Sequence, residues 1–120
     1  MKPVNLIILM LLFFTISGAS ASTITVDMHN NNTSYAFSSI QDAINHAQEH
    51  DSIIISKGIY TESLTIDKPV GLYSVTLDPK DVILESNDSS SPIIHIRSDD
   101  VKIGGITITG KDDTNPQLGF

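Results

Sequence analysis

The chain of 120 residues contains no cysteine and no tryptophan, and only seven lysine and arginine residues stand against 14 aspartate and glutamate residues. Without cysteine it has no disulfide framework, no thiolate zinc site, no Cys-x-x-Cys redox motif and no cysteine nucleophile. The formal net charge of −7 argues against nucleic acid as a partner, because phosphate binding relies on clustered cations. A chain of this length holds at most one modest domain.

The N-terminal segment 1–21 has the three-part layout of a secretory signal peptide. Lys2 gives it a positive start, an apolar run of eleven residues covers 6–16, and Ala19-Ser20-Ala21 ends it with an A-x-A cleavage pattern. The apolar run is too short for a comfortable membrane span, although a leader that stays uncleaved as an anchor is the alternative. We expect an exported protein in the periplasm, at the cell surface or outside the cell, with no membrane span apart from the leader and a mature domain over 22–120.

Isoleucine dominates the apolar residues of 22–120, where it occurs 15 times against five valines and five leucines. β-branched side chains favour strands over helices. Short apolar runs recur between turn residues, and most are only three residues long; they lie at 24–28, 53–55, 64–66, 70–72, 75–77, 82–84, 93–96, 101–103 and 106–108. A sandwich or barrel usually has strands of about five or six residues, so these runs favour a coil in which each strand pairs with the next turn of the coil.

One helix is predicted, over 38–50. Its apolar residues fall at i, i+3, i+4 and i+7, and Ser38 with Gln41 forms a plausible capping box. The stretches that begin at Leu64 and Ile94 share one pattern, apolar-x-Ile, polar turn, Val-x-apolar, and lie about thirty residues apart. The fold class that follows is all-β: a right-handed parallel β-helix of about three coils whose N-terminal end is capped by the helix. Since no C-terminal cap is visible, we expect the chain to be the N-terminal part of a longer solenoid.

Several motifs occur in a fixed order: S-I-Q-D-A-I from Ser39, D-x-I-x-I from Asp51, G-x-Y-x-E at Gly58, L-T-I-D-K-P-V from Leu64, and V-K-I-G-G-I-T-I-T-G from Val101. In this order they resemble the N-terminal cap and first coils of pectin-lyase-like β-helix proteins, above all the NosD-like, carbohydrate-binding and sugar hydrolase (CASH) repeat group. The resemblance covers about 24–110. It implies the fold more specifically than any activity, because esterases, lyases and surface-layer-associated proteins share this opening.

Five residues of these motifs are assigned structural roles. Gly58 is expected to serve a turn with positive φ or a close backbone approach, and Tyr60 to lay its ring over the first coil. Glu62 is expected to accept hydrogen bonds from the turn. Lys68 and Pro69 are expected to form a rigid corner between two strands.

The candidate chemistry is weak. His46, Glu49 and His50 match the H-x-x-E-H zinc pattern, which would place both imidazoles on one helix face, but a helix that ends near His50 makes them weak metal candidates. The carboxylate pairs 99–100 and 112–113 lie in polar turns, where adjacent side chains point apart. No catalytic residue and no cofactor is assigned.

Three N-x-[ST] sequons predict N-glycosylation at Asn31, Asn32 and Asn87. The favoured function is a non-catalytic, exported β-helix module of a cell-surface or extracellular protein, with polysaccharide or cell-envelope components as partners or a structural role. Further β-helix coils or self-association are expected at the uncapped C-terminal end. The alternative is the N-terminal part of a polysaccharide-active lyase or pectin-esterase-like enzyme whose catalytic coils lie elsewhere. A third reading, a periplasmic maturation protein for a copper enzyme, lacks the Cys, Met-rich or His-rich tract for direct copper binding.

Overall fold

The computed structural model describes residues 20–29, 36–86 and 88–110, so the predicted leader up to residue 19, the sequons at Asn31, Asn32 and Asn87, and the carboxylate pair 112–113 lie outside the described residues. The elements follow one another in this order: β1 Thr23–Val26, β2 Ala36–Phe37, α2 Ile40–His46, β3 Ser52–Ile55, β4 Gly58–Thr61, β5 Leu64–Ile66, β6 Gly71–Ser74, β7 Val82–Glu85, β8 Ile94–Ile96, β9 Lys102–Gly104 and β10 Thr107–Thr109. Over these ranges no helix combines the length and the apolar character needed to cross a membrane.

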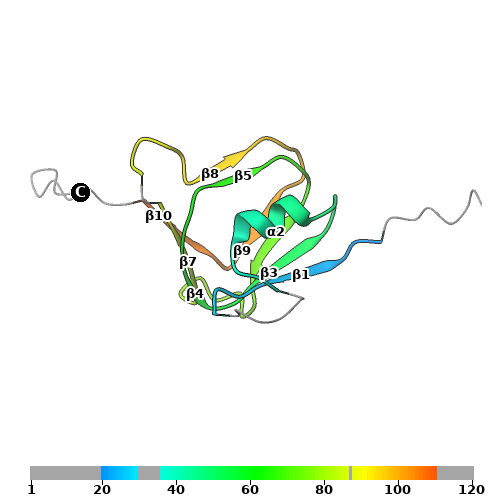
Figure 1. Cartoon of the computed structure of the whole chain (residues 1–120), viewed down its shortest axis with the longest axis horizontal. Helices are drawn as coiled ribbons and strands as arrows, with labels where there is room; N and C mark the ends of the chain where they lie inside the picture. Colours follow the sequence, from blue (N-terminus) through cyan, green and yellow to red (C-terminus); the bar gives the residue numbers. More distant parts are fainter. Residues whose placement is uncertain (1–19, 30–35, 87, 111–120) are drawn as a thin grey trace, which may run out of the picture.

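The strands form three sheets, and every strand pair in them is parallel. Their orders are β2-β1-β3-β6-β9, β10-β7-β4 and β5-β8. A first coil therefore consists of β3, β4 and β5, a second of β6, β7 and β8, and a third begins with β9 and β10. The sheets surround a common interior, and α2 lies across one end of the coil (Figure 1). The arrangement is of the parallel β-helix type.

The strand register confirms the internal repeat predicted from the sequence. Leu64 pairs with Ile94 and Ile66 with Ile96, and in the following strands Leu72 pairs with Ile103. Alternate residues of each strand point inward, because successive side chains of a strand lie on opposite faces. The resulting core is buried from β3 to β7, whereas Ile96 of β8 is half exposed; the buried core includes Ile53, Ile55, Leu64, Ile66, Leu72, Val82 and Leu84.

The predicted helix 38–50 is too long at both ends. The N-cap is Ser39, not Ser38: the Ser39 backbone is extended, and its side-chain oxygen accepts a bond from the Asp42 backbone N–H. Gln41 does not complete a capping box, since its side chain bonds the backbone of Thr65 in the first coil instead. At the other end Ala47 has φ −61° and ψ 149°, an extended conformation that ends the helix after His46.

The prediction of a strand at 75–77 is wrong, and a strand at 58–61 was missed. The chain leaves β6 at Ser74; Val75 and Leu77 are exposed, and Leu77 has φ 59°, which no strand residue adopts. The apolar residues of 75–77 belong to an exposed loop between β6 and β7. The strand β4 was missed because it begins with Gly58 and therefore shows no run of three apolar residues.

Candidate functional site

Glu62 binds the N-terminal end of α2. One of its carboxylate oxygens accepts from the Ser39 hydroxyl at 3.1 Å and from the Gln41 backbone N–H at 2.8 Å, and the other accepts from the Ile40 N–H at 3.1 Å. The sequence predicted donors from the turn, but the donors belong to the N-terminal end of the helix. A carboxylate at this position satisfies N–H groups that have no partner within the helix and complements the positive end of the helix dipole.

Lys68 binds the other end of α2. Its Nζ donates to the carbonyl oxygen of Ala47 at 2.9 Å and to that of Asn45 at 3.4 Å, which are groups that the helix leaves unpaired. The next residue, Pro69, lies in the corner between β5 and β6, and its carbonyl accepts from the His50 N–H at 2.6 Å. Glu62 and Lys68, both from the first coil, thus fix the helix at its two ends.

Tyr60 and Gly58 lie in β4. The Tyr60 ring is buried, its hydroxyl donates to the Ser56 carbonyl at 2.8 Å, and burial raises the pKa of this phenol. Gly58 does not have a positive φ; instead the Met28 side chain lies so close that an added Cβ would come within 2.5 Å of its sulfur. Of the two roles predicted for Gly58, the close approach fits this geometry and the positive-φ turn does not.

The three weak metal candidates do not share a helix face. His46 is the last residue of α2, and its ring packs on Phe37 with centroids 5.1 Å apart. Glu49 and His50 lie beyond the helix end, and His50 has φ 70°. Among the side chains that the structure describes, no three His, Asp or Glu residues are grouped so that they could hold a metal ion.

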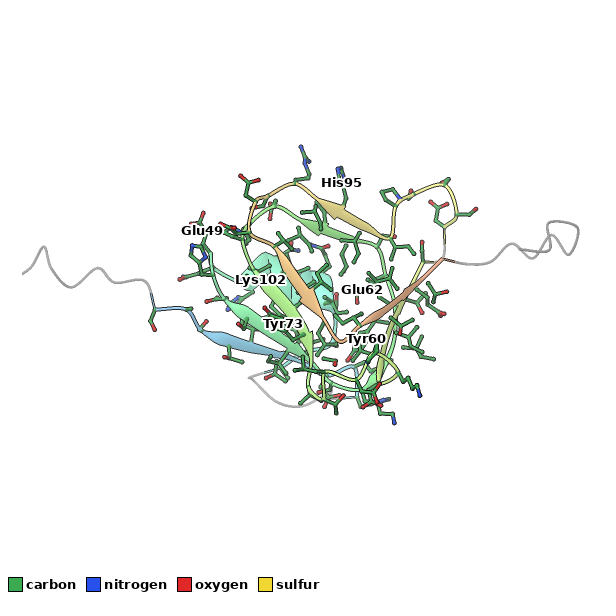
Figure 2. The ribbon with its side chains drawn as sticks, turned by 180° about the vertical axis from the view of Figure 1, so that it is seen from behind. Glu49, Tyr60, Glu62, Tyr73, His95 and Lys102 are labelled. Atoms are coloured by element: carbon green, nitrogen blue, oxygen red, sulfur yellow. The ribbon has the colours of Figure 1, made fainter. Side chains whose placement is uncertain are left out.

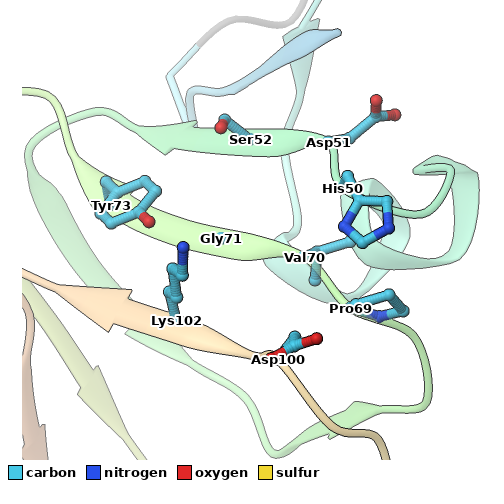
Figure 3. Close-up of a pocket in the computed structure, with 9 residues that line it drawn as sticks. All are labelled: His50, Asp51, Ser52, Pro69, Val70, Gly71, Tyr73, Asp100 and Lys102. Carbon is cyan, nitrogen blue, oxygen red and sulfur yellow. The ribbon is translucent and has the colours of Figure 1, made fainter. Parts of the chain in front are cut away.

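A groove of about 380 Å³ opens on the outer face of the largest sheet, where β3, β6 and β9 begin (Figure 3). We call it the sheet groove. Its walls combine charged, hydroxyl and aromatic side chains from three successive coils and turns; they are His50, Asp51, Ser52, Pro69, Val70, Gly71, Tyr73, Asp100 and Lys102. The sequence did not predict this groove, because its residues come together only when the coils stack.

The Tyr73 ring lies close to two glycines, of which Gly71 lines the sheet groove. A Cβ on Gly71 would come within 2.5 Å of the ring, and one on Gly104, which pairs with Tyr73 on the neighbouring strand, within 3.1 Å. A half-buried aromatic ring over glycine covers backbone that no side chain protects. Lys102, the register partner of Gly71, extends from β9 toward this ring (Figure 3). A ring with charged neighbours suits a ligand that has both apolar faces and hydroxyl groups.

Asp51 connects three segments at the edge of the sheet groove. Its carboxylate, in a residue only 4% exposed, accepts from the Ser22 N–H at 2.7 Å and from the Gln48 N–H at 2.8 Å. The bond from Ser22 is the main cause that lowers the pKa of Asp51, with further contributions from Gln48 and from nearby His46. The sequence showed Asp51 only as the first residue of the D-x-I-x-I motif. The signal that could have identified this carboxylate is its position between the end of the predicted helix and the start of the next strand.

The chain is 30% identical over 112 residues to a cell surface glycoprotein of the archaeon Methanothermus fervidus. The match covers 92% of this chain and 18% of that protein, so the chain spans about a fifth of the length of this relative. No family model matches the chain, and no solved structure matches it.

Proposed function

We propose that the chain is an exported, structural β-helix module of the cell surface. The observation that carries the proposal is the similarity of nearly the whole described coil, with its helix, to part of a protein named cell surface glycoprotein. The predicted leader and the acidic composition agree with an exported surface, and the described residues provide a rigid stack of coils. The role is one of architecture, with no reaction assigned.

The finer fold assignment that we propose is the right-handed, pectin-lyase-like β-helix with the NosD-like or CASH type of repeat. It rests on the motif residues, whose contacts agree with the assignment: the S-I-Q-D-A-I segment forms the helix across the end of the coil, and Glu62 of G-x-Y-x-E binds that helix. The domain boundary, a leader over 1–21 followed by one coil domain, is part of the same proposal.

The partner that we propose for the last coil is a further coil of the same kind. β8, β9 and β10 are the outermost strands of their sheets at one end of the stack, as far as the structure describes the chain. They lie together in front when the molecule is seen from the side opposite α2 (Figure 2). Ile96 and Ile108 are about half exposed there, and the Lys102-to-Gly104 edge has backbone groups available for a parallel strand. Parallel backbone pairing together with isoleucine burial suits a strand and not a helix.

Saccharide binding in the sheet groove is the second part of the proposed function. The Tyr73 ring offers an apolar platform, while Asp100, Lys102 and Ser52 supply hydrogen-bonding groups around it. Such a mixture matches a sugar ring, which has an apolar face and a rim of hydroxyls.

Fractionation of a host that expresses the full-length chain tests the surface role. We expect the protein in the cell envelope, and recovery in the cytoplasm at full length would contradict the proposal.

Isothermal titration calorimetry with cellohexaose and with oligogalacturonate tests the saccharide part, because it measures wild type and Tyr73 variants alike without a fluorescent reporter. We expect Tyr73→Ala to weaken binding about tenfold, as loss of a stacking contact does, while Tyr73→Phe keeps it. Equal affinities of wild type and Tyr73→Ala would exclude the groove.

A further inference from the structure

We propose that removal of the leader creates a salt bridge between the new N-terminal ammonium group of Ser22 and the carboxylate of Asp51. This inference rests on the export and leader removal in the proposed function. It makes Asp51 the receptor for the processed chain end and couples maturation to the stability of the coil.

The position of the predicted cut carries the first step. The A-x-A pattern of Ala19-Ser20-Ala21 places it between Ala21 and Ser22. Hydrolysis by a leader peptidase breaks the bond from the Ala21 carbonyl carbon to the Ser22 nitrogen. Water supplies the hydroxyl of the new Ala21 carboxylic acid and one hydrogen of the new Ser22 amine; near neutral pH the acid releases its proton and the amine takes one up. The Ser22 nitrogen thus changes from a neutral amide to an ammonium.

That same nitrogen is already in contact with a carboxylate. It lies 2.7 Å from Oδ1 of Asp51, while Oδ2 is bound to the Gln48 N–H. Ser22 is fixed in place, because its carbonyl accepts from the Ser52 N–H at 2.9 Å and β1 begins at the next residue. The new charge therefore forms at a position that the β1–β3 pairing holds within bonding distance of Asp51.

Burial differs between the two partners in a way that favours the pair. Asp51 is only 4% exposed, so its charge benefits from a counter-ion, whereas Ser22 is exposed and its ammonium keeps contact with water. Ser20 and Ala21 are exposed as well, so their removal uncovers no buried group. The hydrogen bond already has an ionised acceptor, and an ammonium donor adds to it the attraction between two opposite full charges.

The other charged groups near Asp51 do not supply this counter-ion. His46 acts on the Asp51 carboxylate through space, and His50, Asp100 and Lys102 line the adjoining sheet groove. In the part of the chain that the structure describes, the one lysine ion pair is Lys57 with Asp81, which lie just before β4 and β7. The two carboxylate oxygens of Asp51 thus accept from the N–H of Ser22, at the predicted chain end, and from the N–H of Gln48, just after α2.

The test uses the full-length chain, exported and processed by a host. Mass spectrometry of the purified product defines its N-terminus, and an NMR titration measures the pKa of its α-amino group. The matched control carries Gly-Ser inserted between Ala21 and Ser22, which keeps the cleavage pattern but moves the ammonium two residues away from Asp51. Asp51→Asn is made in both backgrounds.

We expect a product that starts at Ser22 and whose α-amino pKa lies about one unit or more above the usual value of about 7.7. The Gly-Ser insertion and Asp51→Asn should each return it to about 7.7. Because the α-amino pKa is raised in the folded state, the added stability should be present below about pH 7.7 and disappear as the pH rises through the raised value. At pH 6.5 Asp51→Asn should lower the Tm by about 4 °C more in the native-start protein than in the insertion control.

A product that starts at Ser22, with an α-amino pKa of about 7.7 and equal effects of Asp51→Asn in both backgrounds, would overturn the salt bridge and leave the surface role intact. A product processed at another bond would overturn it too. A chain found uncut in the cytoplasm would overturn the proposed export together with this inference. If Asp51→Asn does not fold, the pKa difference between the native start and the insertion control decides.

Discussion

The two ends of the coil differ in how they treat the same kind of residue. Ile66 in β5 and Ile96 in β8 are register partners on successive coils, yet Ile66 is 0% exposed and Ile96 is 49% exposed. At the first end α2 covers the coil with Ile40, Ala43 and Ile44. At the last end the isoleucines of β8 and β10 have no further coil over them among the described residues. Burial in this fold is thus a property of the neighbouring layer, not of the residue.

The covered end also carries more polar anchoring. Glu62 and Lys68 bind opposite ends of α2, and Gln41 bonds the backbone at Thr65, so the helix is held to the first coil by polar as well as apolar contacts. A helix of seven residues is too short to be stable alone, which means that these contacts define it. We therefore expect the first coil to respond strongly to substitution and the last coil weakly.

The largest effect should come from the matched isoleucines. Ile66→Ala leaves a cavity in a closed core and should lower the free energy of unfolding by about 2–5 kcal/mol. Ile96→Ala removes a half-exposed side chain and should cost less than about 1 kcal/mol. Urea denaturation followed by circular dichroism measures both. Equal losses would show that another layer covers the last coil.

The next effect concerns the carboxylate at the helix N-terminus. Glu62→Gln removes the charge that accepts three hydrogen bonds and should lower the free energy of unfolding by about 1–2 kcal/mol. Its matched control is Glu85→Gln on the second coil, where the carboxylate accepts from the Thr61 hydroxyl and meets no helix. The control should change stability by less than about 0.5 kcal/mol. If the two variants lose the same free energy of unfolding, the contact of Glu62 with the helix adds no stability beyond that of the control carboxylate.

The stability that Asp51 contributes at the covered end of the coil should depend on pH. Its pKa is lowered in the folded protein, chiefly by the Ser22 N–H, so the stability it contributes is present above the ordinary value of 3.8 and is lost as the pH falls through the lowered pKa. Asp51→Asn should cost about 1 kcal/mol at pH 6 and progressively less below pH 3.8. Denaturation curves of both proteins from pH 2.5 to 7 measure this difference. A constant difference across that range would contradict the assigned cause.

The smallest effect should come from the helix C-terminus. Lys68→Met keeps the apolar stem but removes the ammonium that binds the Ala47 carbonyl, and it should cost about 0.5 kcal/mol, less at high salt. Lys80→Met, at an exposed loop position, is the control and should be neutral. A thermal melt at two salt concentrations separates the two variants.

The regular part of this architecture could be predicted from the sequence because it depends on local patterns. Isoleucine-rich triplets, their repeat from Leu64 to Ile94 and the apolar stripe of the helix indicated parallel coils with a cap, and the register agrees. The errors arose where tertiary contacts override local signals. Val75 and Leu77 look like strand residues but lie in a loop, and the helix ends at His46 because the chain turns toward β3.

The candidate sites were less predictable, since they are assembled from distant segments. The sheet groove joins Tyr73 with Lys102 and His50, three residues that no local motif connects. Likewise, the hydrogen bond from Ser22 to Asp51 joins the segment before β1 to the turn between α2 and β3, which are far apart in the sequence. Glu62 and Lys68 belonged to motifs with assigned roles, but the sequence did not show that both would bind the ends of α2.

Residue-resolved amide hydrogen exchange of the purified full-length protein tests most directly whether the coil is closed at one end and open at the other. Backbone amides of β3 and β6, which pair on both sides, should exchange only by global unfolding. Amides of β8, β9 and β10 should exchange faster, at lower opening free energies. Uniform protection of all three coils, or slowest exchange in β8 to β10, would contradict the account.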